Sequence, residues 1–126
     1  MEPPKPSLVL SCAGRQIFSS NGTWLFPLLE LERFLLDSAV AAPECWLYDK
    51  LVGKAAALLL VRLGIRKLET DLLSDRAAPV LQAHRVSYRF RARIERLDCR
   101  TEELLADIDD PEQAHRLILA RIDALR

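Results

Sequence analysis

The chain has 126 residues, half of them hydrophobic, which is enough to bury a core in one domain without metals or disulfide staples. Its 18 basic and 18 acidic side chains cancel, so overall charge gives no reason to expect nucleic acid or an anionic membrane as a partner. Three cysteines at wide spacing do not suggest a disulfide framework, and no apolar run is long enough for a signal peptide or a membrane span. We therefore expect a cytoplasmic protein with a flexible start over residues 1–6 and a single α/β domain over residues 7–126.

Strands and helices alternate along the predicted domain. In chain order we expect strands 7–12 and 15–20, helix 27–37, strand 45–48, helix 49–63, strand 65–72, a short helix from Ser74 or Asp75 to His84, strand 86–97, a helical turn 101–106 and a helix from Pro111 onward. Ala13-Gly14 between the first two strands is typical of a hairpin turn. Asp110 suits the cap of the last helix, because Pro111 follows it at the first helical position. This alternation predicts a three-layer α/β sandwich, in which a mixed sheet has helices on both faces and an antiparallel hairpin at one edge.

The most informative segment joins the central strand to the helix that follows it. Exposed amides and the helix dipole make such a junction favourable for an anion or a phosphate. The residues that we expect to bind a ligand there are Asp49, Lys50, Val52, Gly53 and Lys54. The segment is not a P-loop, because it lacks the preceding glycine and the following Ser or Thr. In the plainer interpretation, Asp49 caps the helix, Gly53 packs against a strand and both lysines are solvated.

The same residues carry a family resemblance. The runs Leu8-Val9-Leu10, Arg15 to Ser20, Pro27 to Leu31 and Asp49-Lys50-x-Val52-Gly53-Lys54-Ala55-Ala56 resemble an uncharacterised prokaryotic family with a cytidine deaminase-like fold. The match spans residues 7–97, and its last run is the most specific. The resemblance implies a cytidine deaminase-like sheet with a ligand pocket on the Asp49–Lys54 segment. The family's later Cys-Pro-Met-Glu stretch survives here only as Cys99 and a glutamate, Glu102.

Zinc-dependent deamination does not fit these residues. That reaction uses the signatures His-x-Glu and Pro-Cys-x-x-Cys to hold zinc and move protons. Neither signature is present: Gly53-Lys54-Ala55 stands at the helix start, and Glu102 stands where a cysteine would follow Cys99. The two histidines, His84 and His115, have no metal-ligand spacing and are interpreted as surface residues. We expect no metal and no cofactor.

Two weaker candidates lie later in the chain. Arg89 and Arg91 alternate with apolar residues on the strand 86–97, so they can hold phosphates or an acidic partner. We favour the other interpretation, a solvated sheet edge that charge protects against edge-to-edge pairing. Cys99 and Glu102 form a secondary candidate, although a cysteine without a nearby histidine is usually inert.

Three hypotheses of function follow from these residues. The preferred one is a domain that binds a nucleotide or nucleoside derivative, of the ADP-ribose kind, at the Asp49–Lys54 helix start. The alternatives are a metal-independent enzyme, in which Asp49 is nucleophile or base and a lysine stabilises negative charge, and a subunit of a homo-oligomer. In the homo-oligomer, the C-terminal helix or the arginine strand forms the interface.

Overall fold

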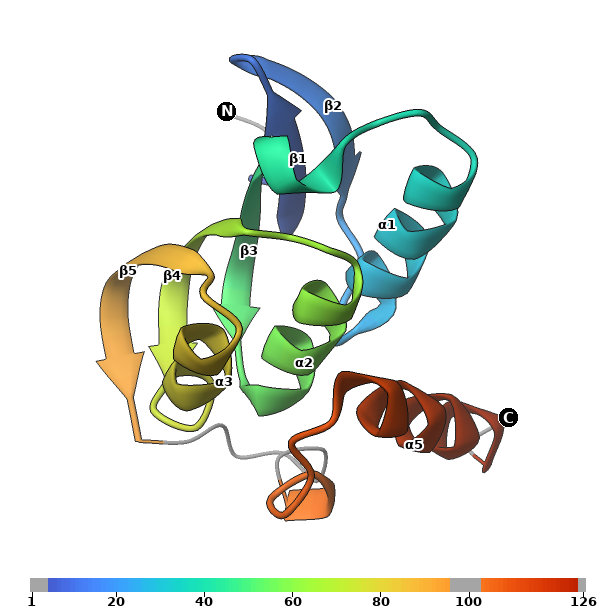
Figure 1. Cartoon of the computed structure of the whole chain (residues 1–126), viewed down its shortest axis with the longest axis vertical. Helices are drawn as coiled ribbons and strands as arrows, with labels where there is room; N and C mark the ends of the chain where they lie inside the picture. Colours follow the sequence, from blue (N-terminus) through green and yellow to red (C-terminus); the bar gives the residue numbers. More distant parts are fainter. Residues whose placement is uncertain (1–4, 96–102, 125–126) are drawn as a thin grey trace.

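The fold is a five-stranded mixed sheet with packed helices (Figure 1), seen in a computed structural model that describes residues 5–95 and 103–124. Its elements are β1 (Leu8–Cys12), β2 (Arg15–Ser20), α1 (Phe26–Leu36), the 3-10 turn η1 (Ala42–Glu44), β3 (Trp46–Val52), α2 (Lys54–Arg62), β4 (Lys67–Ser74), α3 (Ala78–Ala83), β5 (Ser87–Ile94) and α5 (Pro111–Ala124). Residues 1–4 of the predicted flexible start lie outside the described residues. None of the helices in the described part of the chain is long and apolar enough to cross a membrane.

The strands are arranged in the order β2-β1-β3-β4-β5. β1 runs antiparallel to both of its neighbours, whereas β3, β4 and β5 are parallel to one another and are joined through α2 and α3. The tight turn between β1 and β2 places Ala13 at a φ of 52° and Gly14 at 76°. Glycine adopts this left-handed region without steric cost, which explains why the chain reverses there. The predicted hairpin and the predicted mixed sheet are therefore confirmed.

Helix α2 lies at the centre of the helical part. It contacts α1, α3 and α5 as well as β3, so the helices of the described residues lie together on one side of the sheet. The mixed sheet with its packed helices agrees with the predicted three-layer α/β class, and α5 packs on α2. The sequence places helices on both faces, but no helix in the described residues packs on the face that carries Trp46 and Tyr48.

The core lies between the sheet and α2. Alternation in β1 turns Leu8 and Leu10 toward the helices, where both are fully buried, and leaves Val9 on the other face. Helix α2 is buried over most of its length, from Lys54 to Leu60, because other elements surround it. Its three consecutive alanines leave room for the close approach of these neighbours.

The boundary between β3 and α2 differs from the prediction. We expected a helix from Asp49, but the strand continues to Val52 and the helix starts at Lys54. The reason is that β3 lies between two strands: Lys50 N–H donates to Ser7 O at 2.9 Å, and Asp49 and Leu51 are paired with β4. Two hydrogen-bonded ladders outweigh a weak local helix propensity.

Helix capping was predicted correctly at one position and wrongly at another. Asp110 caps α5, because its Oδ2 accepts the Gln113 backbone N–H at 3.2 Å. Ser74 and Asp75 do not cap α3, which begins at Ala78 after Ala77 and has no side-chain cap. Ser74 instead ends β4, and its Oγ accepts the Arg76 backbone N–H.

The expectation of unpaired cysteines was wrong for two of the three. Cys12 and Cys45 form a disulfide between β1 and β3, with their Cα atoms 4.5 Å apart. Ser11 lies opposite Trp46 in the antiparallel pair, so the next position brings Cys12 opposite Cys45. Their separation of 33 residues hides this neighbourhood in the sequence. The pairing means that the cysteines no longer support the expectation of a cytoplasmic protein.

Candidate functional site

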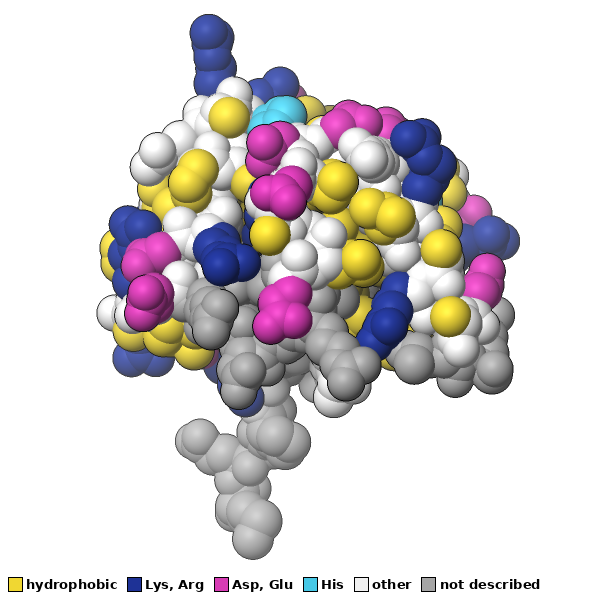
Figure 2. Space-filling view, turned by 90° about the horizontal axis from the view of Figure 1, so that it is seen from below, with side chains coloured by type: hydrophobic (Ala, Val, Ile, Leu, Met, Phe, Trp, Pro, Cys, Tyr) yellow, Lys and Arg dark blue, Asp and Glu magenta, His cyan; other side chains and the backbone are white. Residues whose placement is uncertain are grey.

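A cleft of about 560 Å³ opens beside the amino end of α2. Its lining residues are Lys54, Arg76, Pro79, Val80, Ala83, His84, Ala106 and Asp109. They come from α2, from the β4–α3 connection with α3, and from the segment that precedes α5. The cleft therefore lies near the carboxyl ends of the parallel strands β3 and β4, where α/β sheets commonly bind ligands. Figure 2 shows this end of the molecule, where basic and acidic side chains are interspersed with hydrophobic ones.

Lys54 is the first residue of α2, and its side chain lines the cleft. Its side chain is only 8 % exposed, whereas the side chain of Asp109, its ion-pair partner, is 88 % exposed. Lys54 Nζ lies 3.1 Å from Asp109 Oδ1 and donates to Ala106 O at 2.9 Å. The interpretation of Lys54 as a solvated lysine is therefore wrong. Its ammonium group fixes the segment before α5 against the start of α2.

Two further basic side chains and an apolar wall complete the cleft. Arg76 lies two residues after the end of β4, and His84 is the C-cap residue of α3. Pro79, Val80 and Ala83 present the apolar side of α3 to the same space. Gly53, the N-cap of α2, offers no side-chain oxygen to the first-turn amides of that helix. The arrangement is therefore suited to an anionic group that is attached to an apolar ring or chain.

Asp49 takes a different position from the one that we predicted. It lies within β3, opposite Leu8 of β1 and Thr70 of β4, both fully buried, so its carboxyl group faces the covered side of the sheet. Burial raises the pKa of Asp49 to about 7, although the backbone N–H groups of Leu51 and Lys50 act in the opposite direction. Asp49 does not cap α2, and it is not among the residues that line the cleft.

The other predicted binding residues are divided between strand and helix. Lys50 is exposed on β3, Val52 is fully buried at the end of this strand, and Gly53 is the buried N-cap of α2. Of the predicted set, Lys54 alone lines the cleft. The cleft therefore combines one predicted residue with residues from two other, distant parts of the chain.

The secondary candidates do not contribute to this cleft. Arg89 and Arg91 lie on β5, the strand at one edge of the sheet, as the protected-edge interpretation expected. The guanidinium of Arg89 stacks over the Trp46 ring, 4.4 Å from its centroid. Cys99 and Glu102 lie outside the described residues.

Sequence reasoning missed the three ionisable residues that line the cleft together with Lys54. Arg76 and His84 come from the region around α3, and Asp109 immediately precedes Asp110, the predicted cap of the last helix. These three residues are too far from Lys54 in the sequence for a local pattern to predict that they are neighbours. The hydrogen bond from Lys54 to Ala106, for example, spans 52 residues. The acidic residues Asp107, Asp109 and Asp110 before the last helix were the one available signal in the sequence.

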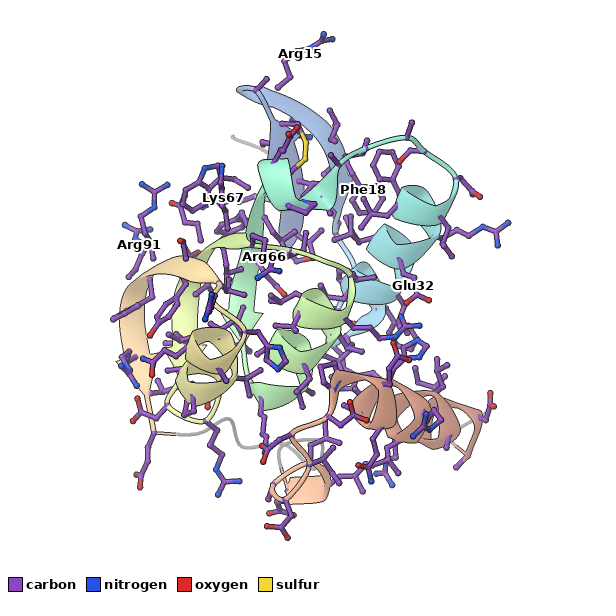
Figure 3. All side chains as sticks on the ribbon, in the orientation of Figure 1. Arg15, Phe18, Glu32, Arg66, Lys67 and Arg91 are labelled. Atoms are coloured by element: carbon purple, nitrogen blue, oxygen red, sulfur yellow. A yellow bond between two sulfur atoms is a disulfide. The ribbon has the colours of Figure 1, made fainter. Side chains whose placement is uncertain are left out.

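The expectation for His115 also needs correction. Its side chain is largely buried, and its Nε2 lies 3.5 Å from Glu32 Oε2. Arg62 donates to Glu32 and also to Glu112, whose Oε1 is 3.1 Å from Arg62 Nε. These groups link α1, α2 and α5, as Figure 3 shows around the labelled Glu32. We interpret this cluster as a structural link between helices.

A metal centre finds no support in the described residues. Across residues 5–95 and 103–124, no three His, Cys, Asp or Glu side chains gather closely enough to hold an ion.

Comparisons with known proteins agree on one family. Residues 5–122 match the model of the domain of unknown function DUF1893. The crystal structure of a DUF1893 family protein from Thermotoga maritima superimposes with a TM-score of 0.81 at 27 % sequence identity, over 92 % of this chain and 80 % of that chain. No curated protein matches the chain. Because the family model covers nearly the whole chain, the protein belongs to the DUF1893 domain family.

Proposed function

We propose that the cleft beside α2 binds a phosphate-bearing small molecule, of the nucleotide or nucleoside-derivative class. The observation that carries this proposal is the convergence of Lys54, Arg76 and His84 on one cleft of about 560 Å³. Small-molecule sites commonly occupy about 300–1,000 Å³. One carboxylate, that of Asp109, lines the cleft and pairs with Lys54, which leaves Arg76 and His84 as the further nitrogen-bearing side chains for an anion. Arginine adds bidentate recognition of phosphate.

The cleft also offers a place for the rest of such a ligand. Pro79, Val80 and Ala83 form an apolar wall, which suits the face of a purine or pyrimidine ring. The first-turn amides of α2 lie beside Lys54, at the positive end of the helix dipole. A ligand can therefore place its phosphate against the start of α2 and its ring against the apolar wall of α3. An ADP-ribose-like molecule has this composition, and the resemblance to a cytidine deaminase-like family supports a nucleoside-derived ligand.

Ligand binding is tested by thermal unfolding with defined compounds. Adenosine, AMP, ADP, ADP-ribose and inorganic phosphate are each added to the full chain, and the melting temperature is followed. We expect a rise with the phosphorylated compounds and little change with adenosine, because a ligand that binds only the folded state stabilises it. The absence of any shift across this series would contradict the proposal.

Variants locate the binding site. Arg76→Gln removes a charge from the cleft and keeps much of the side chain, so the ligand-induced shift should be lost. Arg116 is exposed on α5 and does not line the cleft, so Arg116→Gln is the matched control and should retain the shift. Equal shifts in the two variants would place the ligand elsewhere on the protein.

One observation favours the alternative of a metal-independent enzyme. A carboxyl group with a pKa of about 7, such as that of Asp49, can accept a proton near neutral pH. This carboxyl group does not line the cleft, so catalysis would need a substrate that reaches the covered face of β3 at Asp49. Turnover in a metabolite screen that disappears in Asp49→Asn would favour the enzyme over simple binding.

A further inference from the structure

The outer edge of β5 is a second surface with its own chemistry. β5 is the last strand of the sheet and pairs only with β4 within the described residues. It is regular over eight residues, contains no proline and is exposed along most of its length. Backbone N–H and C=O groups along such an edge are available to pair with a further strand.

The two faces of β5 differ in character. Alternation assigns Arg89, Arg91 and Arg93 to one face and Tyr88 and Phe90 to the other, but the Arg93 guanidinium reaches the Phe90 ring and lies 5.7 Å from its centroid. Phe90 is 42 % exposed, and its ring stacks on Tyr88 with centroids 6.4 Å apart. Figure 3 shows Arg91 at this edge of the sheet, directed away from the helices. A strand added to β5 would therefore meet positive charge on one face and an aromatic surface on the other.

The chain shows what the arginine face accepts. Arg89 lies in register with Glu69 of β4 and donates to its Oε2 at 3.3 Å. Arg93 donates to Asp75 Oδ1 at 2.7 Å. Arg91 forms no ion pair within the described residues, but Asp71 of β4 lies opposite it in the register and accepts the Tyr48 hydroxyl. On the edge of β5 that faces β4, the arginines thus pair with acidic side chains. A further strand at the other edge of β5 could offer them acidic side chains in the same way.

Self-pairing of β5 is disfavoured by its own charges. Two copies related by a two-fold axis perpendicular to the sheet would pair antiparallel, with the same faces aligned. About a centre at Arg91, this pairing sets Arg91 against its own copy and Arg89 against Arg93. Like charges directly opposite each other destabilise a strand pair. The edge is thus protected against a second copy of this chain but not against an acidic strand.

We propose that the outer edge of β5 docks an extended segment of another protein, in which acidic residues alternate with apolar ones. The segment adds a strand to the sheet, so backbone hydrogen bonds supply much of the affinity. Its acidic side chains lie beside the arginines, Arg91 above all, and its apolar side chains cover Phe90. This docking site is separate from the cleft and does not depend on the proposed ligand.

A defined peptide tests the proposal on the full-length chain. The probe is a fluorescent octapeptide of alternating Val and Glu, and its binding is followed by fluorescence anisotropy. Arg91→Glu should weaken binding by about tenfold, which corresponds to 1.4 kcal/mol, because an attractive cross-strand pair becomes repulsive. Arg116→Glu on α5 makes the same change of charge on an exposed helix face and should leave binding unchanged.

Two altered peptides separate strand addition from charge attraction. In one, Lys replaces Glu, and we expect no binding. In the other, Pro replaces every Val, so the charges remain but the backbone cannot form a ladder. Equal binding of the proline peptide and the original peptide would overturn the proposal, because attraction of charge alone would then explain the affinity.

Amide signals in NMR spectra of the wild-type chain give a readout that does not depend on a folded variant. The peptide should shift the amides of Ser87–Ile94 and leave those of β2, the opposite edge strand, unchanged. Shifts confined to other elements would refute docking at β5. Light scattering that shows a dimer of the wild type, and a monomer of Arg91→Glu, would refute it in favour of a second copy.

Discussion

Replacing Asp49 by Asn should remove one specific pH dependence of stability. The pKa of Asp49 rises from 3.8 to about 7 in the folded chain, chiefly because the carboxyl group is buried. Each pKa unit is worth about 1.4 kcal/mol, so the interval between pH 5 and pH 7 sets an upper value of about 3 kcal/mol. Because the residue keeps partial contact with solvent, we expect about 1–2 kcal/mol of this effect to be observed.

The sign follows from proton binding. Between the two pKa values, the folded state keeps its proton on Asp49 and the unfolded state has lost it. Raising the pH therefore favours unfolding, so this residue lowers the free energy of unfolding from about pH 4 to pH 7 and has no further effect above that range. The asparagine side chain of the variant has no proton to lose. The variant should therefore gain on the wild type as the pH rises, and the gain should level off near pH 7.

Urea denaturation at pH 5, 6, 7 and 8 provides the measurement. The difference in free energy of unfolding between Asp49→Asn and the wild type is plotted against pH, so that the other titrating groups cancel. Asp37 is exposed and ion-paired with Arg33, which makes Asp37→Asn the matched control, with a flat difference expected. A flat plot for Asp49→Asn would refute the assignment of a raised pKa to Asp49.

Four further substitutions or treatments test the packing of the molecule. Leu58 is fully buried in α2, so Leu58→Ala should lower the free energy of unfolding by about 2–5 kcal/mol, whereas Leu36→Ala at an exposed position should change it little; equal losses would contradict the core assignment. Reducing the Cys12–Cys45 disulfide should cost about 3–4 kcal/mol through the entropy of the opened loop, and dithiothreitol should have no effect on a Cys12→Ala, Cys45→Ala double variant. Alkylation of both cysteines without reductant would show that the bond is absent. Asp110→Ala removes the α5 cap and should cost about 1 kcal/mol, while Asp107→Ala nearby should not. Lys54→Met should speed hydrogen exchange in residues 103–110, and unchanged exchange there would mean that Lys54 does not hold this segment.

The parts of the fold that the sequence predicted well depend on local patterns. Alternating polar and apolar residues located β5, and a turn with glycine located the β1–β2 hairpin. The Asp110-Pro111 pair located the start of α5, because the cap and its acceptor amide lie within one helical turn. Such signals are readable in sequence because the interacting atoms are at most a few residues apart.

The starting point of α2 shows where local patterns were insufficient. The Asp49–Leu51 run can continue a helix by propensity, but the ladders with β1 and β4 extend β3 through it. This shift of the helix start changes the role of Asp49 from a helix cap to a buried acid. It also changes Lys54 from a solvated lysine to one whose Nζ is bound to Ala106 O.

The sequence by itself determined the class of this domain, an alternation of strands and helices that folds as a mixed sheet, and it identified Lys54 as a residue of the candidate site. Only the tertiary structure decided which residues surround Lys54. Arg76, His84 and Asp109 reach the cleft because α3 and the segment before α5 both pack around the start of α2. The disulfide was hidden for the same reason, since Cys12 and Cys45 meet through strand order. Contacts between distant segments are set by the register of the sheet and the packing of helices on it, and no short window of sequence contains that information.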